Sequence, residues 1–159
     1  MIEIVDVDLS RPGHAQAVPA LIAAYARDDM GGGKALPEEV IAVLAQRLRE
    51  RPDYFGVLAF DGSMPVGLIN CFEGFSTFLA RPLVNIHDVY VAPGYRGQAL
   101  ARRMLDRVEQ VARQHGCAKL TLEVLEGNAA ALASYSKFGF DSYALDPQNG
   151  RAMFWQKVL

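Results

Sequence analysis

The sequence predicts a single α/β domain, and three observations support this prediction. The chain has 159 residues, a length typical of one domain, and 51% of them are apolar, which is enough to fill one core. Short apolar runs typical of strands are interleaved with segments whose apolar residues recur at helical spacing. Between Val84 and Phe140 the chain reads as strand, glycine-containing turn, amphipathic helix, strand and a further helix. We therefore expect one domain that spans residues 1–159.

The first half of the chain contains two expected helices among expected strands. The first helix rests on Val18, Leu21, Ile22 and Tyr25, which recur at helical spacing. The glycine-rich run 28–33 cannot extend this helix, so we expect a mobile loop there. In order, we expect a strand at 2–9, helices at 15–27 and 37–51, and strands at 54–60 and 65–72 around a tight turn.

The second half continues with two helices between strands. Residues 75–82 read as an irregular connection, and Gly116 is the expected end of a helix. In order, we expect a strand at 84–91, a helix at 99–115, a strand at 119–124, a helix at 129–138, and closing strands at 140–145 and 152–157.

Charge and cysteine content exclude several classes of function. The formal net charge of −2 leaves no broad electropositive surface, which argues against a nucleic-acid-binding protein. The two cysteines are too few for a disulfide framework, and neither has the spacing of a metal ligand. The chain opens directly on a strand pattern, and charged or polar residues interrupt each apolar run well before membrane-spanning length. We expect a cytoplasmic protein with no metal, nucleic-acid or membrane partner.

The turn after the strand at 84–91 is the first candidate binding site. Its sequence, APGYRGQA, would place unpaired backbone N–H groups at a helix N-terminus, where they and the helix dipole favour a phosphate. Arg96, Arg102 and Arg103 surround this turn, whereas Arg107 and Arg113 continue along the helix and fit a solvated face. The sequence therefore predicts an anionic cofactor.

Two motifs in this region carry a family resemblance. Residues 96–101, RGQALA, resemble the Arg/Gln-x-x-Gly-x-Gly/Ala loop of the GCN5-related N-acetyltransferases, the GNAT superfamily. The later pattern of that superfamily, Asn-x-x-Ala-x-x-x-Tyr-x-x-x-Gly-Phe, is matched at Asn128, Ala131, Tyr135, Gly139 and Phe140. In one departure, Ala99 stands where the middle glycine is usual. We expect a helical first-turn conformation there, which accommodates a methyl group.

The resemblance implies a fold and a cofactor. The fold is an α/β GNAT domain with a central mixed, mostly antiparallel sheet, splayed at the acetyl-CoA site and flanked by about four helices. Acetyl-CoA would lay its pyrophosphate on the loop and its pantetheine amides along the preceding strand. Asn128 would bind the pantetheine arm, and a helix N-cap is an equally good reading of it. The implied cofactor-binding residues are Val89, Tyr90, Val91, Arg96, Gly97, Gln98, Ala99, Leu100, Ala101, Arg102, Asn128 and Tyr135.

Acetyl transfer to an amine needs an acid and a base. Tyr135 is the candidate acid, because the departing thiolate needs a proton and a phenol with a pKa of about 10 is protonated at neutral pH. The alternative is an aromatic that fills the core. His87 is the candidate base, placed by strand alternation on the face opposite Asp88, with a packed core histidine as its alternative. Glu73 is the rival base or a group that attracts the substrate ammonium, with a solvated strand-end carboxylate as its alternative.

The acceptor is expected to be a primary amine of a small molecule. Residues 75–81 and 86–91 resemble the corresponding region of the diamine and spermidine/spermine acetyltransferases, where a Glu-Asp pair stands in place of His87-Asp88. Asp28, Asp29 and Glu73 could form an acidic mouth for a cation, or be scattered surface carboxylates. No nucleophile elbow is present, so direct transfer is expected over an acyl-enzyme.

Three other functions are alternatives to small-molecule acetylation, and the chain also has an expected oligomeric state. The chain could acetylate a protein N-terminus or lysine, or be a non-catalytic acyl-CoA sensor. An NAD-binding domain is rejected because the Gly-x-Gly-x-x-Gly turn is missing. We expect a homodimer, since superfamily members often pair through C-terminal strands and the apolar run 153–155 lies near the C-terminus; an inner-face strand would also explain that run.

Overall fold

The computed structural model describes residues 1–143 and 146–159, and the chain forms two compact units. The first unit is Met1–Leu125 and the second is Glu126–Leu159. A single domain over residues 1–159 stays a prediction. Among the described residues, no helix has both the length and the apolar character that a membrane span requires.

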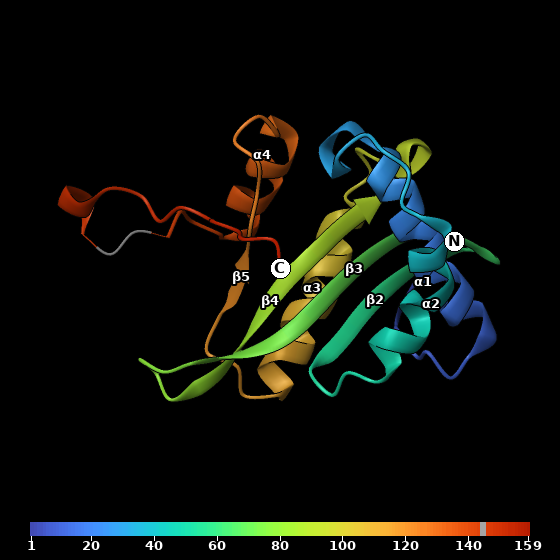
Figure 1. The fold of residues 1–159 in the computed structure, drawn as a ribbon, viewed down its shortest axis with the longest axis horizontal. Helices are drawn as coiled ribbons and strands as arrows, with labels where there is room; N and C mark the ends of the chain where they lie inside the picture. Colours follow the sequence, from blue (N-terminus) through green and yellow to red (C-terminus); the bar gives the residue numbers. More distant parts are fainter. Residues whose placement is uncertain (144–145) are drawn as a thin grey trace. The chain divides into compact units, whose positions relative to one another are not determined.

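A five-stranded mixed sheet forms the centre of the first unit (Figure 1). The strands lie in sequence order, and every neighbouring pair is antiparallel except β4 and β5, which are parallel. This topology confirms the expected mixed, mostly antiparallel sheet. The strands are β1 (Ile2–Asp6), β2 (Tyr54–Asp61), β3 (Met64–Ser76), β4 (Arg81–Val91) and β5 (Leu120–Leu122).

Helices cover both faces of this sheet. The helices of the first unit are α1 (Pro12–Arg27), α2 (Glu38–Arg49) and α3 (Leu100–Gln114), with short 3-10 turns η1 (Asp29–Gly31) and η2 (Pro93–Tyr95). On one face, Leu58, Leu68 and Tyr90 of the sheet pack with Val18 and Leu21 of α1. On the other face α3 lies so close that a Cβ on Gly67 of β3 would come within 2.8 Å of the Met104 sulfur.

Burial explains why these elements hold together. The α3 stripe Leu100, Met104, Leu105 and Val108 is at most 2% exposed, as helical spacing on one face requires. Each such side chain contributes about 1.5–3 kcal/mol when fully buried. At the end of this packed sheet, β4 leads at Val91 into the loop that precedes α3.

Two expectations about the extent of the strands are wrong. Residues 75–82 are not an irregular connection, because β3 and β4 continue as a long hairpin that pairs Ser76 with Arg81 around a four-residue turn. The expected closing strands are absent from residues 140–143 and 151–159, while residues 144–145 lie outside the described part of the chain. The run Ala152–Trp155 is apolar at every position. It therefore lacks the alternation of apolar and polar residues that specifies which face of a strand is buried.

The second unit contains α4 (Ala129–Phe138) and η3 (Pro147–Asn149). The bounds of α4 are those expected from the sequence. Asn128 caps its N-terminus, since its Oδ1 accepts a hydrogen bond from the Ala131 N–H at 3.1 Å. Gly139 ends it at a φ of +111°, a backbone conformation that favours glycine.

Candidate active site

The loop that leads from β4 into α3 turns through two left-handed residues. Gly97 has φ +73° and Ala99 has φ +58° and ψ 16°. The expected helical first-turn conformation of Ala99 is therefore wrong, because Ala99 is the residue before α3 and adopts the conformation that glycine would occupy more easily. This backbone costs an L-residue roughly 1–2 kcal/mol. The turn directs the N–H groups of the following residues along the axis of α3.

The N-terminus of α3 lacks the groups that usually neutralise it. No side chain caps it, and no acidic residue lies in its first turn. The first backbone bond of α3 runs from the Arg103 N–H to the Ala99 carbonyl at 3.1 Å, so the N–H groups of Leu100 and Ala101 lie ahead of the hydrogen-bonded part of the helix. Leu100, 2% exposed, anchors the loop in the core. An anion is the ligand that this helix end favours.

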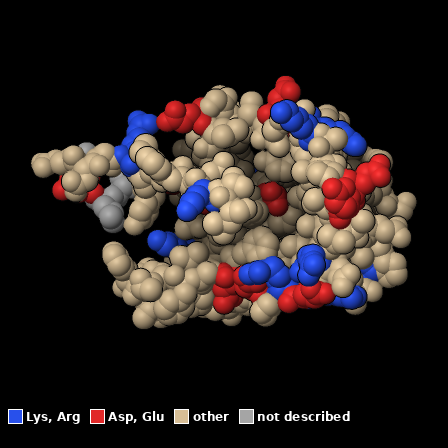
Figure 2. All heavy atoms as spheres, in the orientation of Figure 1, with Lys and Arg blue, Asp and Glu red and all other residues tan. Residues whose placement is uncertain are grey.

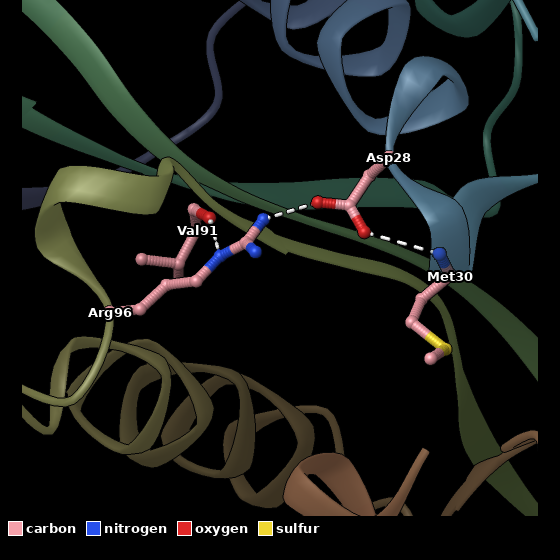
Figure 3. Close-up of polar contacts among 4 residues, drawn as sticks. All are labelled: Asp28, Met30, Val91 and Arg96. Atoms are coloured by element: carbon pink, nitrogen blue, oxygen red, sulfur yellow. Dashed lines mark hydrogen bonds and ion pairs between the residues drawn. The ribbon is translucent and has the colours of Figure 1, made fainter. Parts of the chain in front are cut away.

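Two side chains of the loop brace it from within the first unit. The Gln98 side-chain amide donates to the Gly94 carbonyl at 3.1 Å. Arg96 donates through Nε to the Val91 carbonyl at 2.9 Å and through Nη2 to the Asp28 carboxylate at 2.5 Å (Figure 3). The guanidinium hydrogen bond holds the pKa of Asp28 below its usual value. Asp28 is therefore already ion-paired, which weakens its assignment to an acidic mouth.

The outer edge of β4 opens beside this loop. The pairing of β4 with β5 ends at Ile86 and Leu122, and no strand among the described residues continues it past that point. The Ala92 N–H bonds to β3 at the Val66 carbonyl, so by antiparallel alternation Tyr90 also turns its backbone groups to β3, while Val89 and Val91 turn theirs outward. The Tyr90 ring is buried in the core, at 7% exposure. Val89 and Val91 thus border the open edge.

A β-bulge at His87 breaks the alternation of β4. Asn70 of β3 pairs with Asp88, whereas the next residue, Cys71, pairs with Ile86, so His87 has no partner in the register. The His87 and Phe72 rings pack edge to face with their centroids 5.4 Å apart, and Asp88 accepts a hydrogen bond from Asn70. Asn70 and Phe72 are two residues apart and share a face. The expectation that His87 and Asp88 lie on opposite faces is therefore wrong.

A chain of hydrogen bonds fixes Asp88. The Tyr54 hydroxyl donates to the Asn70 Oδ1, and the Asn70 Nδ2 donates to the Asp88 Oδ2, both at 3.0 Å. Asn70 is only 3% exposed, and burial raises the pKa of the Tyr54 phenol, so Tyr54 remains a donor at any physiological pH. Sequence reasoning missed this group. Asn70, a lone amide within the apolar run of β3, was the signal that could have found it.

Glu73 lies apart from His87 and Asp88. Its carboxylate is 3.3 Å from Nδ1 of His115, the residue that ends α3. On β3, Glu73 shares the α3 face with Cys71 and Ile69, whereas His87 and Asp88 lie on the α1 face. The structure therefore does not bring Glu73 together with His87.

Tyr135 and Asn128 lie in the second unit, where both belong to α4. The Tyr135 ring meets the Phe140 ring edge-on at 5.8 Å. The Phe140 N–H donates to the Tyr135 carbonyl at 3.0 Å and the Gly139 N–H to the Ser136 carbonyl at 3.1 Å, which together form a helix-ending motif. The second sequence motif thus encodes the two ends of one helix as well as the position of its tyrosine.

Charged side chains are mixed over the surface. On the face shown in Figure 2, acidic and basic side chains occur in small groups of both signs. Several are paired, as Arg107 is with Asp6 of β1, at 2.5 Å, and Arg113 with Glu109. Arg113 fits the expected solvated face of α3, whereas Arg107 fastens α3 to β1.

Comparisons with known proteins agree with this geometry. The model of the acetyltransferase (GNAT) family matches residues 19–140. Streptothricin acetyltransferase of Streptomyces lavendulae is 30% identical over 156 residues, which cover 86% of this chain and 82% of that enzyme. Thialysine N-epsilon-acetyltransferase of Bos taurus is 35% identical over 78 residues, 49% of this chain and 45% of that enzyme. The chain thus spans about half the length of this thialysine relative.

Solved structures share the fold at lower identity. The structure of a probable acetyltransferase superposes with a TM-score of 0.81 at 22% identity and covers 98% of both chains. An aminoglycoside N-acetyltransferase solved in complex with CoA gives a TM-score of 0.75 at 14% identity, over 100% of this chain and 96% of that one. With the uncapped α3 N-terminus and the splayed β4 edge, the family match over 19–140 leads to one conclusion. This chain belongs to the acetyltransferase (GNAT) family.

Proposed function

We propose that the protein transfers an acetyl group from acetyl-CoA to a primary amine of a small molecule. The observation that carries this proposal is the loop 96–101, in which two left-handed residues turn uncapped N–H groups of α3 outward beside the open edge of β4. Acetyl-CoA is the acetyl donor of the GNAT family. Its pyrophosphate fits the helix end, and its pantetheine amides fit the outward backbone groups of Val89 and the N–H of Val91, whose carbonyl accepts a hydrogen bond from Arg96.

A small-molecule acceptor is favoured by the relatives. Streptothricin acetyltransferase matches most of this chain, and thialysine acetyltransferase matches about half of it. Both names describe acetylation of small molecules. The acceptor would lie on the α1 face of β4, where the bulge brings His87 and Asp88 together.

The proposed reaction is a direct transfer. The amine nitrogen attacks the thioester carbonyl carbon, a C–N bond forms, and the C–S bond breaks to release CoA thiolate. His87 accepts the proton that the ammonium loses before attack. As the amide forms, the nitrogen loses a second proton to solvent, and Tyr135 donates a proton to the thiolate and is reprotonated by solvent. The position of Glu73 beside His115, on the other face of the sheet, favours His87 as the base. Asp88, held by Asn70, supplies a fixed negative charge that attracts the ammonium.

The base assignment is tested by pH–rate profiles of three variants. His87→Gln should change the acidic limb of the kcat/KM profile, while Glu73→Gln should leave it unchanged. Asp88→Asn should raise the KM of a cationic amine more than it lowers kcat, since it removes an attractive charge. An acidic limb that follows only the pKa of the acceptor, and persists in His87→Gln, would assign deprotonation to water.

The cofactor assignment is tested by thermal shift with acetyl-CoA. Binding to the native state should raise the melting temperature of the wild type. Gly97→Glu should abolish the shift, because it places a side chain and a negative charge in the phosphate loop. Gly62→Glu is the matched control, since Gly62 has a similar φ of +61° and equally open surroundings in the β2–β3 turn. Equal shifts in both variants would contradict the assignment.

We also propose a homodimer. The residues Met153, Phe154 and Trp155 are 72–80% exposed, which is unusual for three consecutive large apolar side chains. A partner surface would cover them.

A further inference from the structure

The loop between α1 and α2 is organised by Asp28. The Asp28 backbone carbonyl accepts hydrogen bonds from the N–H groups of Gly31 at 2.9 Å and Gly33 at 3.0 Å. Its carboxylate Oδ1 accepts the Met30 N–H at 3.1 Å. Gly31 sits directly on α1, because a Cβ there would come within 1.9 Å of the Tyr25 carbonyl oxygen. The loop 28–33 therefore folds around Asp28, and its mobility stays a prediction.

Arg96 holds this loop from outside. Its Nη2 donates to Asp28 Oδ2 at 2.5 Å, and its Nε donates to the Val91 carbonyl at 2.9 Å (Figure 3). The guanidinium also lies 5.9 Å from the centre of the buried Tyr90 ring. The Asp28 side chain is 21% exposed and that of Arg96 is 47% exposed, so the pair is partly shielded from water. Arg96, the first residue of the loop 96–101, thus directs its charge toward the loop 28–33.

The loop 28–33 borders the face that carries the candidate acceptor groups. Tyr25, one turn before Asp28, packs against Tyr90 with ring centres 5.9 Å apart. Burial raises the pKa of the Tyr25 phenol, and the negative charges of Asp88 and Asp28 raise it further. Tyr90 and Asp88 are two residues apart on β4 and therefore share a face of the sheet. The loop lies beside the same α1 face of β4 on which His87 and Asp88 were found.

We infer that Arg96 is a positioning residue that couples occupation of the cofactor loop 96–101 to the placement of the loop 28–33 beside the acceptor face. The coupling has a physical basis. The backbone of Arg96 is part of the cofactor loop, and its side chain donates hydrogen bonds to Asp28 and to the Val91 carbonyl. A cofactor that fixes residues 97–101 also fixes the origin of the Arg96 side chain, and so restricts Asp28. This inference rests on the proposed function, because it requires that CoA bind at 97–101.

Hydrogen–deuterium exchange with free coenzyme A as the probe tests the coupling. In the wild type, CoA should slow amide exchange both at 97–101 and at 30–34. Arg96→Gln should speed exchange at 30–34 about two- to tenfold without CoA, the range expected for losing a partly shielded ion pair. In that variant CoA should still protect 97–101 and no longer protect 30–34.

Two further variants sharpen the result. Asp28→Asn keeps an acceptor for the Met30 N–H and removes the charge, so it should reproduce the effect of Arg96→Gln, and the double variant should add little to either. Arg113→Gln, which removes an arginine from an exposed pair on α3, should behave as the wild type.

The outcomes separate the two claims. Protection of 30–34 by CoA that persists in both Arg96→Gln and Asp28→Asn would refute the coupling and leave the proposed function intact. Absence of CoA protection at 97–101 in the wild type would refute the cofactor site itself, and the coupling with it.

Discussion

Replacing Ala99 by glycine should stabilise the protein, although glycine weakens the interior of a helix. Ala99 has φ +58°, where its Cβ costs roughly 1–2 kcal/mol. Glycine removes that cost. It also gives the unfolded chain more conformational freedom, which lowers the free energy of unfolding by about 0.4–1 kcal/mol. The free energy of unfolding should therefore rise by about 0.5–1 kcal/mol, which corresponds to roughly 1–4 °C in Tm for a chain of this size.

Urea unfolding of the cofactor-free protein measures this effect, with Ala101→Gly as the matched control. Ala101 lies in the first turn of α3, in the helix proper. There glycine should destabilise by roughly 0.5–1 kcal/mol. The two alanines are two residues apart. Opposite signs of the change in the free energy of unfolding would therefore establish that the backbone conformation determines the effect of glycine. Destabilisation of similar size in both variants would refute the claim that Ala99 carries backbone strain.

Three further predictions concern catalysis, pH and assembly. Tyr135→Phe keeps the ring contact with Phe140 and removes the hydroxyl, so kcat should fall about 10²- to 10⁴-fold with little change in acetyl-CoA affinity; an unchanged kcat, with chemistry rate-limiting, would exclude Tyr135. Burial lowers the pKa of His14, whose Nδ1 accepts a hydrogen bond from the Asp8 N–H. As the pH falls, this histidine therefore takes up its proton in the unfolded chain before it does so in the folded protein. The free energy of unfolding should decrease as the pH drops below about 6.5. His14→Gln should flatten this decline in urea unfolding between pH 7.5 and 5.5, and an unchanged slope would count against His14. Light scattering should give twice the chain mass of 17.4 kDa, and Trp155→Ser should shift it toward the monomer; a wild-type monomer would exclude pairing.

Local signals in the sequence were sufficient for the elements whose ends are capped locally. The helix α4 was predicted at its observed bounds, because Asn128 and Gly139 are cap residues that act within one turn. The sheet topology followed from the order of strands and helices and from the resemblance to a known family. The loop 96–101 was likewise found from its residues.

Features that depend on register or on distant partners could not be predicted. The face on which His87 lies is set by a bulge, which exists only in the pairing of β3 with β4. The Asp28–Arg96 pair joins residues 68 positions apart, and nothing local in either segment indicates it. The closing strands at 140–145 and 152–157 were inferred from apolar content, which does not by itself specify a sheet partner.

Transfer of isotopically labelled acetyl from acetyl-CoA tests the central claim most directly. The acceptor panel should contain polyamines, amino acids, streptothricin, thialysine, aminoglycosides and peptides, and mass spectrometry should locate the label. We expect the label on a primary amine of a small molecule with the wild type and with Gly62→Glu, and no transfer with Gly97→Glu. Label found only on peptides would contradict the proposed acceptor class. No transfer to any amine, at acetyl-CoA concentrations that stabilise the protein, would contradict the enzymatic function and leave an acyl-CoA-binding protein.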